Sequence, residues 1–230
     1  MNRARHLLEI PSPGLFHGAY LAEVVSLNDP DNRSRVQVRL YNFDGVDGQD
    51  GPIWARVAAP FAGNNRGAFL LPDVGDEVLV AFVNSDPRYP VVVGGLWNGS
   101  DAAPESISSG RNLKKVIRSK NGVKITLEDQ DGQEKFIAET PGGQKVTLQD
   151  GPGSITIEDS NGNSVKLESS GITVTASAKV TVNASQVSVS AGMVQVDAGM
   201  SKFSGVVQCD TLIATTVVAS TYTPGAGNIW

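Results

Sequence analysis

The sequence has one cysteine, Cys209, among 230 residues, so it cannot form an intramolecular disulfide. Cys209 lies in the apolar stretch GVVQCDTLIA, and we expect it to be a buried small side chain rather than a reactive thiol. No run approaches the roughly 20 apolar residues of a membrane-spanning helix. The N-terminal MNRARHLLEIPSPG lacks the apolar core of a signal peptide. We therefore expect a chain made in the cytoplasm without a signal peptide.

Aromatic residues and excess positive charge are also scarce. Only 6% of the residues are aromatic although 40% are hydrophobic, and there are 25 glycines, which favours many short strands of small side chains. The net charge is −5, which gives no basic field for nucleic acid. Residues 1–110 hold 8 basic and 13 acidic residues, whereas residues 111–230 hold 11 of each, so the acidity lies in the N-terminal half.

Residues suited to catalysis or metal binding are few. The two histidines, His6 and His17, have no cysteine or carboxylate cluster near them in the sequence, and no phosphate-binding glycine motif is present. We predict no enzymatic activity, catalytic residue, metal site or cofactor. The acidic groups that could suggest glycoside hydrolysis or calcium binding fall in predicted turns and loops, where solvated corners explain them. These groups are Glu158 with Asp159, Asp129 with Asp131, and Asp29, Asp31, Asp44, Asp47 and Asp50.

The N-terminal part has the pattern of a small β-barrel. Six segments are apolar or alternate apolar with polar residues, and Gly-, Asn-, Asp- and Pro-rich turns separate them. No helical periodicity intervenes, so we predict a closed barrel or sandwich of five or six strands. The segments are 20–27, 34–43, 53–61, 67–72, 76–83 and 90–97.

A different pattern begins after residue 120. Residues 100–120 are polar and then basic, which is typical of a linker or collar. From residue 121, short strand cores such as KVTLQD, SITIED and SVKLES follow one another. Their leading apolar residues are 7 to 10 positions apart, too close for a helix in each repeat. One strand and one tight corner per repeat predict a β-helix. The leading residues are Val146, Ile155, Val165, Ile172, Val180, Val187 and Val194.

A single copy of this repeat would bury little, because each strand has one apolar face of Val, Ile and Ala. Three identical chains wound about one axis would let each apolar face meet two copies of itself, as in a triangular prism. Pairing between chains would also satisfy backbone groups that a lone strand leaves open. We therefore expect a narrow, stiff homotrimeric needle. Residues 171–223 carry only four charges, which suits tight cross-sections.

The quoted segments resemble a known family. The stretches WARVAAPFAG, LPDVGDEVLVAFVNSDPRYPVVVGGLWNG and GAYLAEVVSLNDPDNRSRVQVRLYNF are similar to the OB-fold domain of phage baseplate assembly protein V and of VgrG. Residues 121–223 resemble the intertwined trimeric β-helix that follows this domain in contractile injection machines. The resemblance implies an all-β fold, with an N-terminal segment at 1–17, an OB domain at 18–99, a linker at 100–120 and a spike at 121–230.

The same resemblance implies the function and the partners. It implies a structural homotrimeric central spike of a phage tail or extracellular injection particle, which punctures the target cell envelope when the sheath contracts. We expect the hub to be a separate protein, bound by Arg3, Arg5, Leu7 and Leu8 unless this segment is disordered. The His-x-His iron tip of short phage spikes is absent, so we expect a PAAR-like tip protein. It would dock on the end at 222–230, through Tyr222, Pro224, Ile229 and Trp230.

Other functions remain open at this point. A trimeric tail fibre or glycan-binding tailspike would need an aromatic and acidic groove between strands. An OB module that binds nucleic acid would need aromatic platforms in a basic groove, whereas this domain is acidic. We expect no nucleic-acid partner. The basic residues of segment 111–120 either offset the acidic domain or contact a negative partner, and Trp230 is either a packed cap or an exposed contact.

Overall fold

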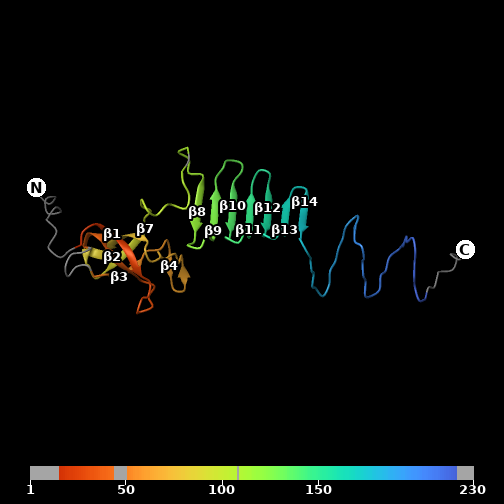
Figure 1. Cartoon of the computed structure of the whole chain (residues 1–230), viewed down its shortest axis with the longest axis horizontal. Coiled ribbons are helices and arrows are strands. Elements are labelled where there is room, and N and C mark those ends of the chain that lie inside the picture. Colours follow the sequence, from red (N-terminus) through yellow and green to blue (C-terminus); the bar gives the residue numbers. More distant parts are fainter. Residues whose placement is uncertain (1–15, 44–50, 108, 222–230) are drawn as a thin grey trace, which may run out of the picture. The chain divides into compact units, whose positions relative to one another are not determined.

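The computed structural model describes residues 16–43, 51–107 and 109–221 of the chain (Figure 1). Strands provide nearly all the regular structure in these residues, together with two 3-10 turns, η2 (Tyr41–Phe43) and η3 (Val83–Ser85). The predicted all-β class is therefore confirmed. No helix able to cross a membrane occurs in the part of the chain that the structure describes. The chain divides into two units, which meet between Lys179 and Val180.

A closed five-stranded barrel forms the N-terminal part of the first unit. Its order is β1 (Ala19–Ser26), β2 (Val36–Leu40), β3 (Ile53–Val57), β7 (Pro90–Gly95) and β6 (Glu77–Phe82). Only β3 and β7 pair in parallel, and the other neighbours are antiparallel. Closure removes the free edges that an open sheet would present. The predicted barrel is confirmed in this form.

Small branched side chains fill the barrel because alternate residues of each strand point inward. The buried core is made of Ala22, Val24, Val36, Val38, Ala55, Val78, Val80, Phe82 and Val92. The rings of Phe16, Tyr20, Phe43 and Phe82 pack on one another, with the closest centroids, those of Phe16 and Phe82, 4.6 Å apart. These four rings form one aromatic cluster of the barrel domain.

One predicted barrel segment forms no barrel strand. Residues 68–72 of the stretch GAFLLP have no strand partner, and only Gly67 belongs to a strand, β5 (Arg66–Gly67). This strand pairs with β4 (Ala62–Gly63) in a hairpin outside the barrel. A Cβ on Gly67 would lie 2.9 Å from the carbonyl oxygen of Phe61, so the close approach of these two backbones requires glycine. The apolar residues of this stretch therefore line a surface instead of the core.

Seven strands after the barrel form one antiparallel sheet, in which each strand pairs with its neighbours in sequence (Figure 1). The sheet includes β8 and β10, which the repeat pattern does not identify, and β8 lies inside the segment predicted as a linker. The strands are β8 (Lys114–Arg118), β9 (Lys124–Glu128), β10 (Lys135–Glu139), β11 (Lys145–Gln149), β12 (Ser154–Glu158), β13 (Ser164–Glu168) and β14 (Gly171–Thr175).

The expected pairing between chains is wrong for these strands. Each of β9 to β13 has both of its neighbours within the chain, because turns of two to six residues return the chain antiparallel to the previous strand. The backbone groups that were expected to need another chain are thus satisfied locally. One face of this sheet, in contrast, has no packing partner within the described residues.

Residues 176–221 differ from the sheet because no strand is assigned in them. The chain runs in extended segments between bends (blue in Figure 1), including bends at Ser185, Gly192 and Gly199. The strands predicted at 179–185, 186–192 and 193–199 are therefore extended segments that no neighbouring segment of the same chain pairs with. Here the backbone hydrogen-bonding groups still need a partner.

Candidate functional surfaces

Two continuous rows of apolar side chains cover one face of the β8–β14 sheet. The register places directly paired residues on the same face, so each row crosses the sheet from strand to strand. The first row is Ile117, Ile125, Ala138, Val146, Ile157, Val165 and Val174. The second row is Leu127, Phe136, Leu148, Ile155, Leu167 and Ile172. We call this surface the apolar face.

The opposite face is largely polar. Its middle row follows the same register and contains four threonines and a lysine beside two apolar residues, in the order Val116, Thr126, Ile137, Thr147, Thr156, Lys166 and Thr173. Lysine and glutamate side chains on neighbouring strands form ion pairs along its margins. The distances are 3.5 Å for Lys124–Glu139, 3.8 Å for Lys135–Glu128 and 3.3 Å for Lys145–Glu158. This face is suited to water, and such exposed ion pairs add little stability.

On this sheet, apolar residues are exposed to solvent while a polar residue is buried, which is the reverse of what a single folded sheet should have. The only buried residue of the sheet is a polar one, Thr126, at 4% exposure. On the apolar face, Leu127 is 46% exposed, Leu148 43% and Ile157 50%. A contiguous apolar surface of this kind on a soluble chain marks an interaction site. The apolar face therefore requires a covering partner.

A carboxylate organises the turn between β12 and β13. Asp159 accepts hydrogen bonds from the backbone N–H groups of Asn161 and Asn163, each at 2.9 Å, and from the amide side chain of Asn163 at 2.8 Å. These donors, the Asn163 side chain first, lower the pKa of Asp159 to about 2. Neighbouring Glu158 pairs with Lys145. Both adjacent acids thus have structural partners. Asp159 lies in a turn, as the sequence predicts, whereas Glu158 is the last residue of β12.

The acidic loop before β2 is held by one arginine. The guanidinium of Arg35 lies 2.6 Å from Asp29 and 2.8 Å from Asp31, and Asp29 also accepts backbone hydrogen bonds from Arg33 and Arg35. The Arg35 side chain lowers the pKa of Asp29 well below its usual range. Arg35 therefore occupies the position that a cation would need. Asp129 likewise pairs with Lys115. Within the described residues, no cluster of ligands suited to a metal ion is present.

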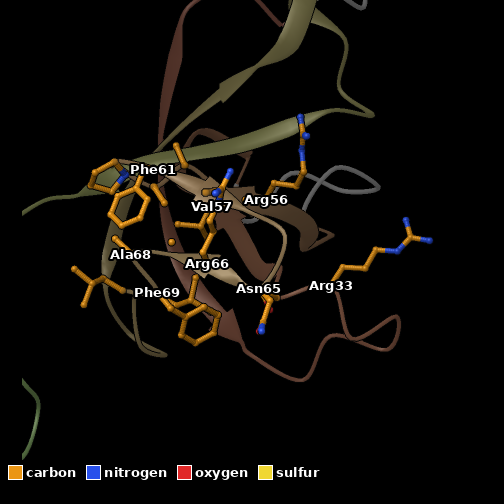
Figure 2. Close-up of a pocket in the computed structure, with 17 residues that line it drawn as sticks. Arg33, Arg56, Val57, Phe61, Asn65, Arg66, Ala68 and Phe69 are labelled. Carbon is orange, nitrogen blue, oxygen red and sulfur yellow. The ribbon is translucent and has the colours of Figure 1, made fainter.

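An open cleft of about 740 Å³ lies beside the β4–β5 hairpin of the barrel. Exposed Phe61 and Phe69 lie toward one side of it, and Arg33 and Arg56 toward the other (Figure 2). Its lining contains no Asp, Glu, His or Cys, so it offers neither a metal site nor a nucleophile with its base. Apolar walls with arginines at the rim suit contact with a protein surface. The sequence gives no periodic signal for this cleft.

The residues predicted for hub and tip contacts lie outside the described residues. This applies to Arg3, Arg5, Leu7 and Leu8 at one end and to Tyr222, Pro224, Ile229 and Trp230 at the other. Asp44, Asp47 and Asp50 of the acidic loop fall outside them as well. The apolar face, in contrast, includes residues that the repeat pattern misses, such as Phe136 and Ile117. The short apolar run of KFIAE, bounded by charged residues, is the signal that could have identified β10.

Two family models match the chain. Residues 20–97 match the type VI secretion system/phage-baseplate injector OB domain. Residues 135–199 match the phage baseplate V C-terminal trimerisation domain. The first match covers the closed barrel and its cleft, and the second covers β10 to β14 and part of the extended segments that follow. The apolar face thus lies mostly within a domain whose family trimerises.

Several curated proteins are similar to part of the chain. The type VI secretion system spike protein VgrG3 of Vibrio cholerae serotype O1 is 30% identical over 113 residues, which are 46% of this chain and 11% of that protein. Spike protein VgrG4b of Pseudomonas aeruginosa is 32% identical over 113 residues, which are 46% of this chain and 14% of that protein. A V. cholerae protein named actin cross-linking toxin VgrG1 is 26% identical over 112 residues, which are 46% of this chain and 10% of that protein.

The chain spans between 10% and 14% of the length of these three curated relatives. The similarity nevertheless agrees with both family matches, which together cover more than half of the chain. With an injector OB domain followed by a baseplate trimerisation domain, the chain belongs to the VgrG-like baseplate spike proteins.

Proposed function

We propose that the chain acts as a homotrimeric central spike, which is driven mechanically through a target cell envelope when a contractile sheath shortens. The observation that carries the trimer is the apolar face, most of whose residues are exposed in the single chain. Three copies packed by these faces form a closed prism with a dry interior and polar outer walls. The match to a trimerisation domain over residues 135–199 supports the same assembly.

The proposed mechanism needs stiffness and no chemistry from this chain. Paired strands resist bending, and the ion pairs and threonine row of the polar face keep the outer surface hydrated. Three of the four acidic residues considered for catalysis are engaged in the fold, namely Glu158 by Lys145, Asp129 by Lys115 and Asp159 by Asn163. We therefore propose a structural, non-enzymatic role. The work would come from the contracting sheath.

The proposed partners follow from position in such a machine. The spike would assemble in the baseplate of a phage tail or injection particle, with a hub protein at its N-terminal end and a PAAR-like tip protein at its C-terminal end. The barrel cleft, with Phe61, Phe69 and three arginines, offers a further protein contact in a crowded baseplate. A glycan-binding tailspike is less well supported, because the paired rows of the polar face contain no aromatic residue among the described strands.

The mass of the native protein tests this proposal. Light scattering coupled to size exclusion should give three times the 24.2 kDa of the single chain. The trimer should also resist SDS without boiling, because dissociation of a packed prism requires the apolar faces to be exposed to water. A monomer at micromolar concentration would overturn the proposed spike.

A further inference from the structure

The C-terminal unit contains two repeats of different length. The bends at Ser185, Gly192 and Gly199 are seven residues apart. After a bend at Ser204 and Gly205, the next bends are at Asp210, Thr215 and Ser220, five residues apart. At roughly 3.3 Å per extended residue, a segment between bends shortens from about 20 Å to about 13 Å. The change occurs beyond residue 199, where the matched trimerisation domain ends.

Residue type separates the two faces of the seven-residue repeat. Valines at the second and fourth positions after a bend are 64% and 69% exposed in one repeat, Val187 and Val189, and identically so in the next, Val194 and Val196. A side chain on the inner side of a winding chain is partly covered by neighbouring turns, whereas one on the outer side is not. The positions that alternate with these valines hold polar residues, including Asp197, except for Met193, which is 79% exposed. These valines therefore define the inner face.

The five-residue repeat has the same division. The second residue after each bend is less exposed than an apolar residue next to it in sequence. Val207 is 61% exposed against 97% for Val206, Leu212 74% against 93% for Ile213, and Val217 58% against 94% for Val218. The second and fourth positions are entirely apolar, namely Val207, Cys209, Leu212, Ala214, Val217 and Ala219, whereas most of the other positions are polar.

We propose that residues 206–220 form a second, narrower trimeric section, in which the face containing Val207, Cys209 and Leu212 packs against the same face of two other copies. The occupant is a second and a third copy of this chain, because the segment begins shortly after residue 199, where the matched trimerisation domain ends, and no strand of its own chain pairs with it. This inference rests on the proposed trimer and adds its register, that is, which residues of 206–220 face the trimer axis and which face outward. Cys209, exposed in the single chain, becomes buried at the axis. Ile213 and Val218 stay on the outside.

Thiol reactivity of the native full-length protein tests the register. Cys209 is the only cysteine, so labelling with 5,5′-dithiobis(2-nitrobenzoate) reports on this site alone. The matched control places a cysteine at the first position after the next bend, Thr211→Cys, in a Cys209→Ala background. We expect native Cys209 to react at least about 100-fold more slowly than the control thiol, and equally fast after denaturation.

A pair of adjacent substitutions gives a second, independent reading. Leu212→Asp places three carboxylates at the axis and should reduce the resistance of the trimer to SDS, whereas Ile213→Asp should leave it unchanged. Equal thiol rates for Cys209 and the control in a protein of trimeric mass would overturn the register and leave the spike intact. A monomeric mass would overturn both the spike and this register.

Discussion

At the scale of single residues, the charged groups of this chain hold turns and loops. Asp29 is bound by Arg35, Asp86 by Arg88 and Asp159 by Asn163. In each case the partner lowers the pKa of the carboxyl, to about 2 for Asp86 and Asp159. A carboxylate with a lowered pKa is a poor proton donor or acceptor at neutral pH, so these values favour structural roles over general acid–base catalysis.

Replacement of Asp159 by alanine should destabilise the β12–β13 turn in a pH-dependent manner. The folded-state pKa of about 2 lies below the ordinary value of 3.8, so the carboxylate stabilises the fold fully above pH 4. That contribution is lost as the pH falls toward 2. Thermal unfolding followed by circular dichroism should show a Tm a few degrees lower for Asp159→Ala at pH 7.

The control for this prediction is Asp150→Ala, another turn carboxylate of the sheet, for which no side-chain hydrogen bond or ion pair occurs among the described residues. Its Tm should change little at either pH. A difference between wild type and Asp159→Ala that stays constant from pH 7 down to pH 2 would contradict the role assigned to the ionised carboxylate.

At the scale of elements, the two faces of the β8–β14 sheet make opposite predictions. Leu148 and Thr147 are neighbours on β11 and point to the apolar and polar faces, respectively. Leu148→Asp should shift the mass measured by light scattering from trimer toward monomer, because an unpaired carboxylate would be buried in the prism. Thr147→Asp should leave the trimer intact, since its side chain points to water.

The pair is matched for position and for the poor β-propensity of aspartate. Loss of the trimer in both variants would indicate a general failure of the sheet, and retention in both would show that the apolar face is not the interface. Circular dichroism of each variant distinguishes failure of the sheet from loss of the interface alone, because strand content is retained only if the strands still pair within one chain.

The sequence predicts some elements better than others for physical reasons. Barrel strands such as Val36–Leu40 alternate strictly, and alternation depends only on one buried face. The sequence pattern does not identify β8, because this strand begins with two charged residues, Lys114 and Lys115. It does not identify β10, because charged residues lie at both ends of that strand. Whether a strand pairs within or between chains leaves no trace in alternation, since both bury the same face. The cleft depends on the hairpin at Gly67, whose two-residue strands are too short to show an alternation of apolar and polar residues.

At the scale of the whole molecule, the chain has two kinds of segment that a trimer would treat differently. The β8–β14 sheet is hydrogen-bonded within one chain and lacks only a cover for its apolar face. Residues 176–221 have no strand partner of their own and need other chains for both packing and backbone hydrogen bonds. Association of three chains through the β8–β14 sheet would be reversible. Winding of residues 176–221 around one another would link the three chains topologically.

This difference predicts how a shortened chain would behave. A variant that ends at residue 178 keeps the sheet and its apolar face but lacks the extended segments. It should still form trimers at micromolar concentration, since the two apolar rows remain. In SDS at room temperature it should dissociate at least about tenfold faster than the full chain, because its unfolding no longer requires three wound chains to separate. Unboiled gel samples taken over time measure both rates, and light scattering before the addition of SDS confirms the starting mass. Equal lifetimes for the two proteins would place the kinetic stability in the sheet and remove the argument for wound chains.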